Sequence, residues 1–302
     1  MDLPDKFIER YSKIVDNPER FFASLGNLAP KSFRVNTIKA TNAEIEERFE
    51  SYGIEIKKTA WYPEAYVSSN PDIGGTLEHF LGKIYIQELA SMLPPLAVKE
   101  ELKSANFVLD LCAAPGSKTT QISAIMDNKG LVVANDINYD RIKALKFNIE
   151  KTGSLNTMIS NFDGRKFPDN QFDVVFLDAP CSSEGTMRKS FDISSRWSEK
   201  MINGHASLQK QLVLRAFDLL SPGGTMIYST CTFAPEEDEG IVNYLVQNRE
   251  AKIEKISIPN FVFDSGIVEW NEQKFDSDVK KACRVWPHHN DTEGFFLAKV
   301  TK

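Results

Sequence analysis

Two of the four cysteines in this chain follow directly on short apolar runs that are typical of strands. Cys181 ends the stretch "FDVVFLDAPC" (172–181), and Cys231 ends "TMIYSTC" (225–231). A cysteine thiolate is both a strong nucleophile and a workable leaving group, so a cysteine held at a strand end could do covalent chemistry. The alternative for any single cysteine is a small buried hydrophobe. The residue pattern alone leaves open which of the two would react.

Metal chemistry is not expected. No close Cys-x-x-Cys pair of the kind used by zinc sites occurs among the four cysteines, which are Cys112, Cys181, Cys231 and Cys283. His288 and His289 are adjacent but have no spaced partners. A disulfide framework is also not expected in a reducing cytoplasm.

From about residue 105 onward, short apolar runs alternate with helical patterns. The expected strands are 106–113, 130–137, 156–163, 172–180, 225–231, 251–258 and 294–302. Strands that alternate with helices of 10–15 residues build a mostly parallel α/β sheet covered on both faces. Ligands bind beyond the carboxyl ends of such strands, where Asp178, Cys181 and Cys231 fall.

Residues 1–95 have a different pattern. A strand at 32–40, a helix at 41–53 opened by Thr41 with Glu44 three residues on, and a further strand region at 54–69 predict a small α+β module. A helix at 85–98 is expected to bridge this module to the sheet. The predicted division is a module at 1–100 and a catalytic domain at 101–302.

The stretch "DLCAAPGSKTT" (110–120) reads as a strand–turn–helix junction, in which Gly116 supplies backbone freedom. It matches neither a G-x-G-x-x-G fingerprint nor a P-loop. Asp136 ends the second strand, where an acid would accept hydrogen bonds from ribose hydroxyls, and Asp163 ends the third, placed to meet an adenine amino group. An adenosine-bearing cofactor therefore fits better than a phosphate-bearing one. The alternative is that each aspartate merely ends a strand or caps a helix.

The bulk composition favours a cytoplasmic protein. No stretch approaches the ~20 apolar residues of a membrane span, and "MDLPDKFIERYSK" has acids and no apolar core, unlike a secretory signal. The net charge of −6 argues mildly against a protein that coats nucleic acid, but it leaves room for a local basic groove.

Taken together, "DLCAAPGSKT", "DAPCS" and "YSTCT" closely resemble the RNA (cytosine-5) methyltransferases of the Nol/Nop/Sun group. The resemblance extends to "FRVNT" (33–37), "GKIYIQELASMLP" (82–94), "PEEDEGIV" (235–242) and "RVWPHHNDTEGFFLAKV" (284–300), and so covers most of the chain. It implies S-adenosyl-L-methionine as cofactor. It also implies a Rossmann-like, seven-stranded methyltransferase sheet with an antiparallel last strand.

The resemblance also implies roles for residues. Cys231, in the Thr-Cys motif, would attack carbon 6 of cytosine, and Cys181 would assist breakdown of the adduct. Asp178 would contact the cofactor and the base, and Lys118 would orient the catalytic groups. The implied cofactor-binding residues are Cys112, Ala113, Ala114, Pro115, Gly116, Ser117, Lys118, Asp136, Arg141, Asp163 and Asp178.

The expected partner is RNA, and the layout is more like that of the family's transfer-RNA enzymes than of its larger ribosomal ones, with ribosomal RNA as the alternative. Cations and aromatics in "RKSFDISSRW" (188–197) suit a strand of RNA, although a solvated loop with core aromatics explains them equally well. Lys31, Arg34 and Lys39 make the amino-terminal module a second candidate RNA surface.

Two other functions stay open from the sequence. A DNA cytosine-5 methyltransferase would use Cys181 as nucleophile and leave the Thr-Cys motif idle. A binding module without turnover would be expected to have lost a cysteine or the cofactor loop, and this chain keeps both.

Overall fold

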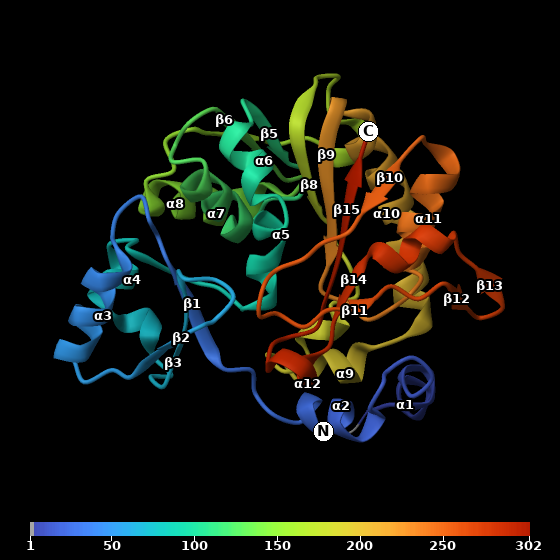
Figure 1. Cartoon of the computed structure of the whole chain (residues 1–302), viewed down its shortest axis with the longest axis horizontal. Coiled ribbons are helices and arrows are strands. Elements are labelled where there is room, and N and C mark those ends of the chain that lie inside the picture. Colours follow the sequence, from blue (N-terminus) through green and yellow to red (C-terminus); the bar gives the residue numbers. More distant parts are fainter. Residues whose placement is uncertain (1–2) are drawn as a thin grey trace.

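The computed structural model describes residues 3–302 and is built around a large mixed sheet (Figure 1). Its parallel part has the strand order β7-β6-β5-β8-β9. These strands are β5 (Phe107–Asp110), β6 (Leu131–Asn135), β7 (Thr157–Ser160), β8 (Phe172–Asp178) and β9 (Leu220–Thr230). All five were expected from the sequence, and the Rossmann-like α/β fold is confirmed.

The carboxyl-terminal strand completes the sheet from its other side. β15 (Phe295–Thr301) runs antiparallel to β9, with Phe296 opposite Thr230 and Thr301 opposite Thr225. Beyond β15 lie β10 (Lys252–Glu254) and β14 (Cys283–Val285), both antiparallel to it, and β11 (Asp264–Ser265) pairs with β14. The sequence did not indicate β14 and β11, which are only two or three residues long.

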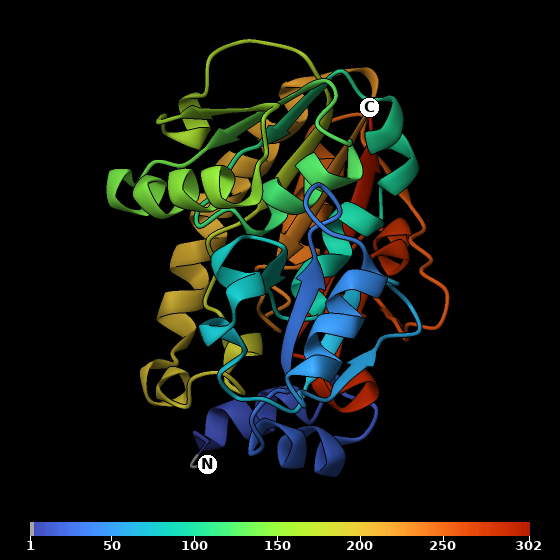
Figure 2. The ribbon, with the colours of Figure 1, turned by 90° about the vertical axis from the view of Figure 1, so that its left-hand side faces the viewer.

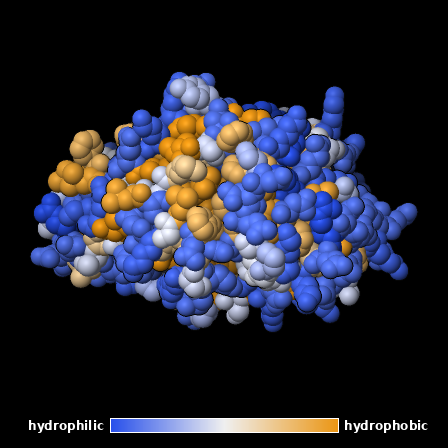
Figure 3. All heavy atoms as spheres, turned by 90° about the horizontal axis from the view of Figure 1, so that it is seen from above, coloured by the Kyte–Doolittle hydropathy of each residue, from blue (hydrophilic) through white to orange (hydrophobic). Residues whose placement is uncertain are grey.

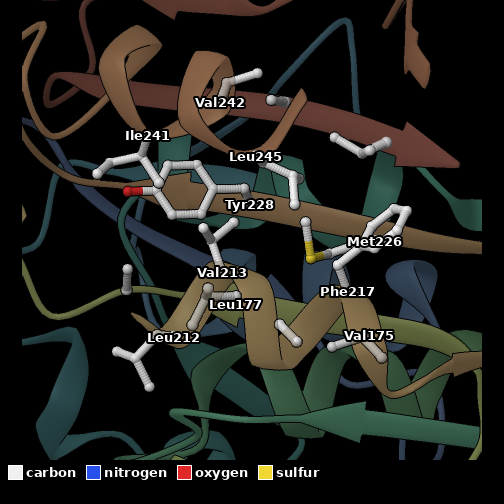
Figure 4. Packing of buried hydrophobic residues seen from close by; sticks show 14 of the residues in the cluster. Val175, Leu177, Leu212, Val213, Phe217, Met226, Tyr228, Ile241, Val242 and Leu245 are labelled. Atoms are coloured by element: carbon white, nitrogen blue, oxygen red, sulfur yellow. The ribbon is translucent and has the colours of Figure 1, made fainter. Parts of the chain in front are cut away.

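Helices cover both faces because the strands are apolar on both sides. α10 (Glu199–Asp218) and α11 (Glu239–Asn248) pack on one face, where Leu212, Val213 and Phe217 meet Val175 and Met226 (Figure 4). On the other face, α6 (Lys99–Ser104) and α7 (Ser117–Ile125) pack against β5, β6 and β8. α8 (Tyr139–Thr152) packs beside the turn that follows β5.

The amino-terminal module is a small antiparallel sheet with the strand order β2-β3-β1-β4. Its elements are β1 (Lys31–Val35), α3 (Asn42–Ser51), β2 (Ile56–Lys58), β3 (Ala65–Ser68), α4 (Leu77–Phe80) and β4 (Ile84–Ile86). As expected, Thr41 caps α3, and Thr41 and Glu44 form a reciprocal capping box. The module stands beside the end of the large sheet at which the parallel strands finish (Figure 2).

The expected bridging helix at 85–98 is wrong. Residues Ile84–Ile86 pair with β1 instead, a single 3-10 turn follows at Ala90–Met92, and α5 covers only Leu93–Leu96. Pro94 and Pro95 explain the break, because proline lacks an N–H group and is tolerated only in the first turn of a helix.

The first two helices do not pack on the small sheet. α1 (Asp5–Tyr11) and α2 (Pro18–Leu25) lie beneath the carboxyl ends of the parallel strands, near α9 (Asp192–Arg196) and α12 (Pro287–Asn290) (Figure 1). An aromatic cluster joins them to the part of the chain that carries the large sheet, and it includes Phe7, Tyr11, Phe21, Trp197, Phe233 and Trp286. Among residues 3–302, no helix is both long and apolar enough to cross a membrane.

The face seen in Figure 3 lies at the opposite end of the sheet, where the parallel strands begin. Apolar side chains gather on its left half, and the right half is mostly hydrophilic. Exposed apolar side chains near the strand starts include Phe107 and Leu155.

Candidate active site

The two cysteines singled out from the sequence meet at the carboxyl edge of the sheet. β8 and β9 are neighbouring parallel strands, with Asp178 opposite Ser229. The turns that follow them therefore lie side by side and bring Sγ of Cys181 to 3.4 Å from Sγ of Cys231. Both side chains line a cavity of about 580 Å³ at this edge. A pair of thiols at the mouth of a cavity can attack a bound electrophile and then release it.

A buried ion pair stands beside the thiols. Lys118, in the first turn of α7, is only 5% exposed, and its Nζ lies 2.7 Å from Oδ2 of Asp178. The other oxygen of Asp178 accepts a hydrogen bond from Ser229 at 2.8 Å. The Phe295 ring lies 5.3 Å from the Lys118 ammonium. Asp178 is thus fixed at the cavity wall with its charge balanced by Lys118.

The turn between β5 and α7 depends on Gly116. Its φ of +103° is in the region that favours glycine, and a Cβ there would come within 2.9 Å of the Leu145 side chain. The turn brings the Ala114 N–H to Oδ2 of Asp136 at 3.2 Å. Arg141 also pairs with Asp136 and donates to the Ala114 carbonyl oxygen. Loop, acid and arginine therefore form one unit at the cavity rim.

The cavity suits an adenosine-bearing cation. Three carboxylates from the ends of β6, β7 and β8 line it, namely Asp136, Asp163 and Asp178. Carboxylates accept hydrogen bonds from ribose hydroxyls and amino groups and stabilise positive charge, as S-adenosyl-L-methionine requires. Apolar walls come from Ile137, Leu208 and Leu212. Asp163 is also paired with Arg165, which lowers the pKa of that carboxyl.

The predicted site residues divide into those that line the cavity and those that lie behind its wall. The cavity is lined by Cys112, Asp136, Arg141, Asp163, Asp178, Cys181 and Cys231. Behind this lining, Ala113, Ala114, Pro115, Gly116 and Ser117 form the turn, and Lys118 reaches Asp178 from the start of α7. Burial raises the pKa of the Cys112 thiol, so Cys112 is a neutral wall residue. Cys283 lies in β14 away from the cavity, and burial raises its pKa to about 12.

A set of buried carboxylates beneath the two cysteine turns was not identified from the sequence. Glu184 is fully buried and accepts hydrogen bonds from the hydroxyls of Tyr11 (2.6 Å) and Thr232 (2.8 Å). It also accepts the N–H groups of Phe233 (3.1 Å) and Trp197. One carboxylate thereby ties α1 to both cysteine turns.

The segment "PEEDEGIV" supplies the rest of this support. Glu237 accepts the Ser182 N–H at 3.0 Å and the Gln209 amide at 2.9 Å, and burial raises its pKa to about 7. The next acid but one, Glu239, pairs with the guanidinium of Arg284 on β14. The only sequence signal was the motif itself, because its partners come from distant parts of the chain.

Two of the cations expected to contact RNA, Arg34 and Arg188, are buried in the structure. Arg34 is fully buried and donates to Gln87 and Thr120. Arg188 is 3% exposed and is held by the carbonyls of Leu28 and Thr292 and others. Neither guanidinium can reach a phosphate from these positions. Trp197 likewise belongs to the aromatic cluster under α1, as the alternative interpretation of 188–197 had it.

His288 and His289 lie outside the cavity. Asp16, in the turn between α1 and α2, pairs with both, at 2.9 Å from Nε2 of His288 and 3.1 Å from Nε2 of His289. These three groups lie within 4.8 Å of one another. Asp16 could not be identified from the sequence, because it lies 272 positions away from His288.

Comparison with known proteins agrees with the resemblance to RNA methyltransferases seen in the sequence. Residues 97–301 match the model of the 16S rRNA methyltransferase RsmB/F family, and residues 3–89 match that of the amino-terminal domain of 16S rRNA methyltransferase RsmF. A tRNA (cytosine(49)-C(5))-methyltransferase of Pyrococcus abyssi is 40% identical over 98% of this chain and 96% of its own length.

Other relatives act on ribosomal RNA by name. Ribosomal RNA small subunit methyltransferase F of Vibrio campbellii is 40% identical over 99% of this chain, which spans 63% of that protein. A crystal structure of a methyltransferase homologue from Pyrococcus horikoshii superimposes with a TM-score of 0.87 at 29% identity, covering 99% of this chain and 95% of the other. The chain belongs to the RsmB/F family of RNA cytosine-5 methyltransferases, which use S-adenosyl-L-methionine as the methyl donor.

Proposed function

We propose that this protein methylates carbon 5 of a cytosine in transfer RNA through a covalent adduct between Cys231 and carbon 6 of the base. The observation that carries this proposal is the pair of thiols 3.4 Å apart at the rim of an acid-lined cavity. Carbon 5 of cytosine is a poor nucleophile, and addition of a thiolate at carbon 6 pushes electron density onto it.

The environment of Cys181 supports Cys231 as the attacking residue. Pairing with Cys231, together with burial, raises the pKa of the Cys181 thiol well above its usual value. Cys181 therefore keeps its proton at neutral pH and can donate it in a hydrogen bond to the Cys231 sulfur. Such a hydrogen bond favours the negative charge that develops on the Cys231 sulfur as it leaves the methylated base.

Asp178 contacts the base in this proposal, and Lys118 holds Asp178 in place. The Asp178 carboxylate is held by Lys118 and Ser229, so its orientation is set before any ligand arrives. It can accept a hydrogen bond from the exocyclic amino group of cytosine. The Lys118 ammonium lies 2.7 Å from that carboxylate and balances its negative charge.

The loop at 110–118 and the acids Asp136 and Asp163 hold the cofactor in this proposal. Asp136 accepts the ribose hydroxyls, Asp163 meets the adenine amino group, and the turn around Gly116 shapes the space for the amino-acid end. S-adenosyl-L-methionine supplies an electrophilic methyl group on a sulfonium centre. Arg141 holds Asp136 and the loop together, as its contacts with both indicate.

Transfer RNA is the proposed substrate because the similarity to the tRNA enzyme of Pyrococcus abyssi extends over nearly the whole of both chains. Ribosomal RNA is the alternative, favoured by the names of the Vibrio relatives. The RNA must present an unpaired or flipped cytosine to the cavity.

The test is methyl transfer from labelled S-adenosyl-L-methionine to separated transfer-RNA and ribosomal-RNA pools. Wild type is compared with Cys231→Ala, Cys181→Ala and the matched control Cys283→Ala, whose thiol lies outside the cavity. We expect no turnover with Cys231→Ala, a trapped protein–RNA adduct with Cys181→Ala, and wild-type turnover in the control. The labelled pool identifies the substrate.

Activity in Cys231→Ala together with loss in Cys181→Ala would reverse the assignment of the nucleophile. Labelling of the ribosomal pool alone would reject transfer RNA and leave the chemistry intact.

A further inference from the structure

Two adjacent histidines of α12 direct their ring nitrogens at one carboxylate. Nε2 of His288 lies 2.9 Å from Oδ1 of Asp16, and Nε2 of His289 lies 3.1 Å from Oδ2 of the same residue. The three groups offer ligand atoms that all lie within 4.8 Å of one another. Two ligands bound to a tetrahedral zinc ion are themselves about 3.3 Å apart, so these distances are close to those of a metal site.

The fold holds the two imidazoles in place. The His288 side chain is 2% exposed, and its ring packs edge-on against Phe21 with the centroids 5.9 Å apart. The His289 ring lies beside it, at 4.2 Å between centroids. Asp16 is exposed, in the turn that leads into α2, and α2 lies next to α12 (Figure 1). A cation can therefore reach the two buried nitrogens from the side of Asp16.

A second carboxylate stands behind His289. Oδ2 of Asp264, on β11, lies 3.4 Å from Nδ1 of His289, and within residues 3–302 neither of these buried atoms has a hydrogen-bond partner. If a neutral His289 ring gives its Nε2 proton to Asp16, its Nδ1 lone pair faces the Asp264 oxygen, and two acceptors repel each other. A cation on Nε2 moves the ring proton to Nδ1, from which it can be donated to Asp264. Metal-bound histidines are commonly held by a carboxylate in this way.

The charge and the atom types of the group also favour a divalent cation. Imidazoles are mostly neutral at pH 7, so Asp16 and Asp264 give the group two negative charges. The Arg20 guanidinium, which donates to the His288 carbonyl oxygen at 3.5 Å, offsets one of them. Imidazole nitrogens suit zinc and the other late first-row metals, whereas Mg²⁺ prefers oxygen ligands.

We propose that Asp16, His288 and His289 bind one divalent cation of the zinc type. Asp264 is a positioning residue, which orients the His289 ring through Nδ1. The site lies outside the acid-lined cavity and does not depend on the proposed function.

The ion would join the turn between α1 and α2 to the segment behind the nucleophile. The chain after α12 leads to Gly294, whose N–H donates to the Gly185 carbonyl at 2.9 Å, and the Gly185 N–H donates to the Cys231 carbonyl at 2.9 Å. The ion is therefore a structural brace, and it takes no part in the reaction.

The test measures zinc binding and does not use methyl transfer. The full chain is prepared without a histidine tag, freed of metals by dialysis against a chelator, and titrated with ZnCl₂ by calorimetry. The variants are Asp16→Asn, His289→Ala and Asp264→Asn, and the matched control is His79→Ala, which removes a histidine of α4. Thermal melting of each protein is recorded with chelator, with Zn²⁺ and with Mg²⁺.

In wild type we expect one saturable site outside the cavity and a rise in melting temperature of about 4 °C when Zn²⁺ is at 100 times the Kd. Asp264→Asn should weaken binding about tenfold, and loss of a ligand in Asp16→Asn or His289→Ala should weaken it more. His79→Ala should bind as wild type, and Mg²⁺ should not shift the melting temperature.

The catalytic thiols can also bind zinc, so the double variant Cys181→Ala/Cys231→Ala is titrated as well. It should keep the site. Zinc binding that disappears in this variant and persists in Asp16→Asn and His289→Ala would place the ion in the cavity and overturn the inference.

The absence of saturable binding in wild type would also overturn the inference, and would leave His289 as an imidazolium between two carboxylates. An equal melting shift with Mg²⁺ would reject ligation by the imidazoles. Asp16→Asn decides the matter even if His289→Ala does not fold, because Asp16 is exposed and asparagine has nearly the same shape.

Discussion

Replacing Glu184 by methionine should destabilise the protein strongly, because four buried donors depend on this carboxylate. Methionine keeps the bulk of the side chain but cannot accept hydrogen bonds from Tyr11, Thr232, Phe233 or Trp197. Each buried donor left without an acceptor costs about 1 kcal/mol or more, so the expected loss is about 4 kcal/mol. The unfolding entropy of a chain of 302 residues is about 0.6 kcal/mol/K, so this loss corresponds to a fall in melting temperature of about 6 °C.

The assay is thermal unfolding followed by circular dichroism, with Tyr11→Phe as the matched control. Tyr11→Phe removes one of the four hydrogen bonds and should cost about 1–2 kcal/mol, or a few degrees. A Glu184→Met protein that melts within about 2 °C of wild type would refute the reasoning. So would a Tyr11→Phe shift as large as that of Glu184→Met, because the four bonds would then not contribute separately.

Three further predictions concern the cofactor loop and the buried acids. Asp136→Asn should weaken S-adenosylhomocysteine binding about tenfold in calorimetry while RNA binding in gel shifts stays unchanged, and equal loss of both would contradict the assigned role. Gly116→Ala should lower both the melting temperature and the cofactor affinity, because a side chain at φ +103° costs about 1–3 kcal/mol and would contact Leu145. A variant with the melting temperature of the wild type would contradict this prediction. Burial raises the pKa of Asp110 and of Glu237 to about 7, whereas both carboxyls lose their protons near pH 4 in the unfolded chain. The melting temperature should therefore fall as the pH rises from about 5 to about 7, and it should fall less steeply in Glu237→Gln. A wild-type melting temperature that does not change with pH would contradict this prediction.

The cavity could be predicted from the sequence to the extent that it consists of strand ends. Asp136, Asp178, Cys181 and Cys231 each follow an apolar run, and parallel strands bring their carboxyl ends to one edge. Neither the distances nor the ionic partners followed from this rule. The contact between Lys118 and Asp178 depends on the helix after β5 pointing its first turn at the end of β8.

The support of the site could not be predicted, because it consists of contacts between residues far apart in the chain. Tyr11 meets Glu184 across 173 positions, and Glu88 meets Glu293 across 205. No periodicity links such residues, and a single sequence offers no other signal of proximity. Arg34 shows the opposite kind of error, a contact that was expected and does not occur. This cation was assigned to an RNA surface, but the small sheet buries it against α7.

The placement of β15 has a consequence for synthesis on the ribosome. This strand lies between β9 on one side and β10 and β14 on the other, so β9 keeps an open edge until residues 295–301 have emerged. Nascent chains that carry everything up to β14 therefore expose an apolar strand edge, which is a template for intermolecular pairing. The same residues bring Phe295 under Lys118, so the site cannot be complete before the sheet closes. Ribosome-bound chains stalled before residue 295 should consequently depend on chaperones.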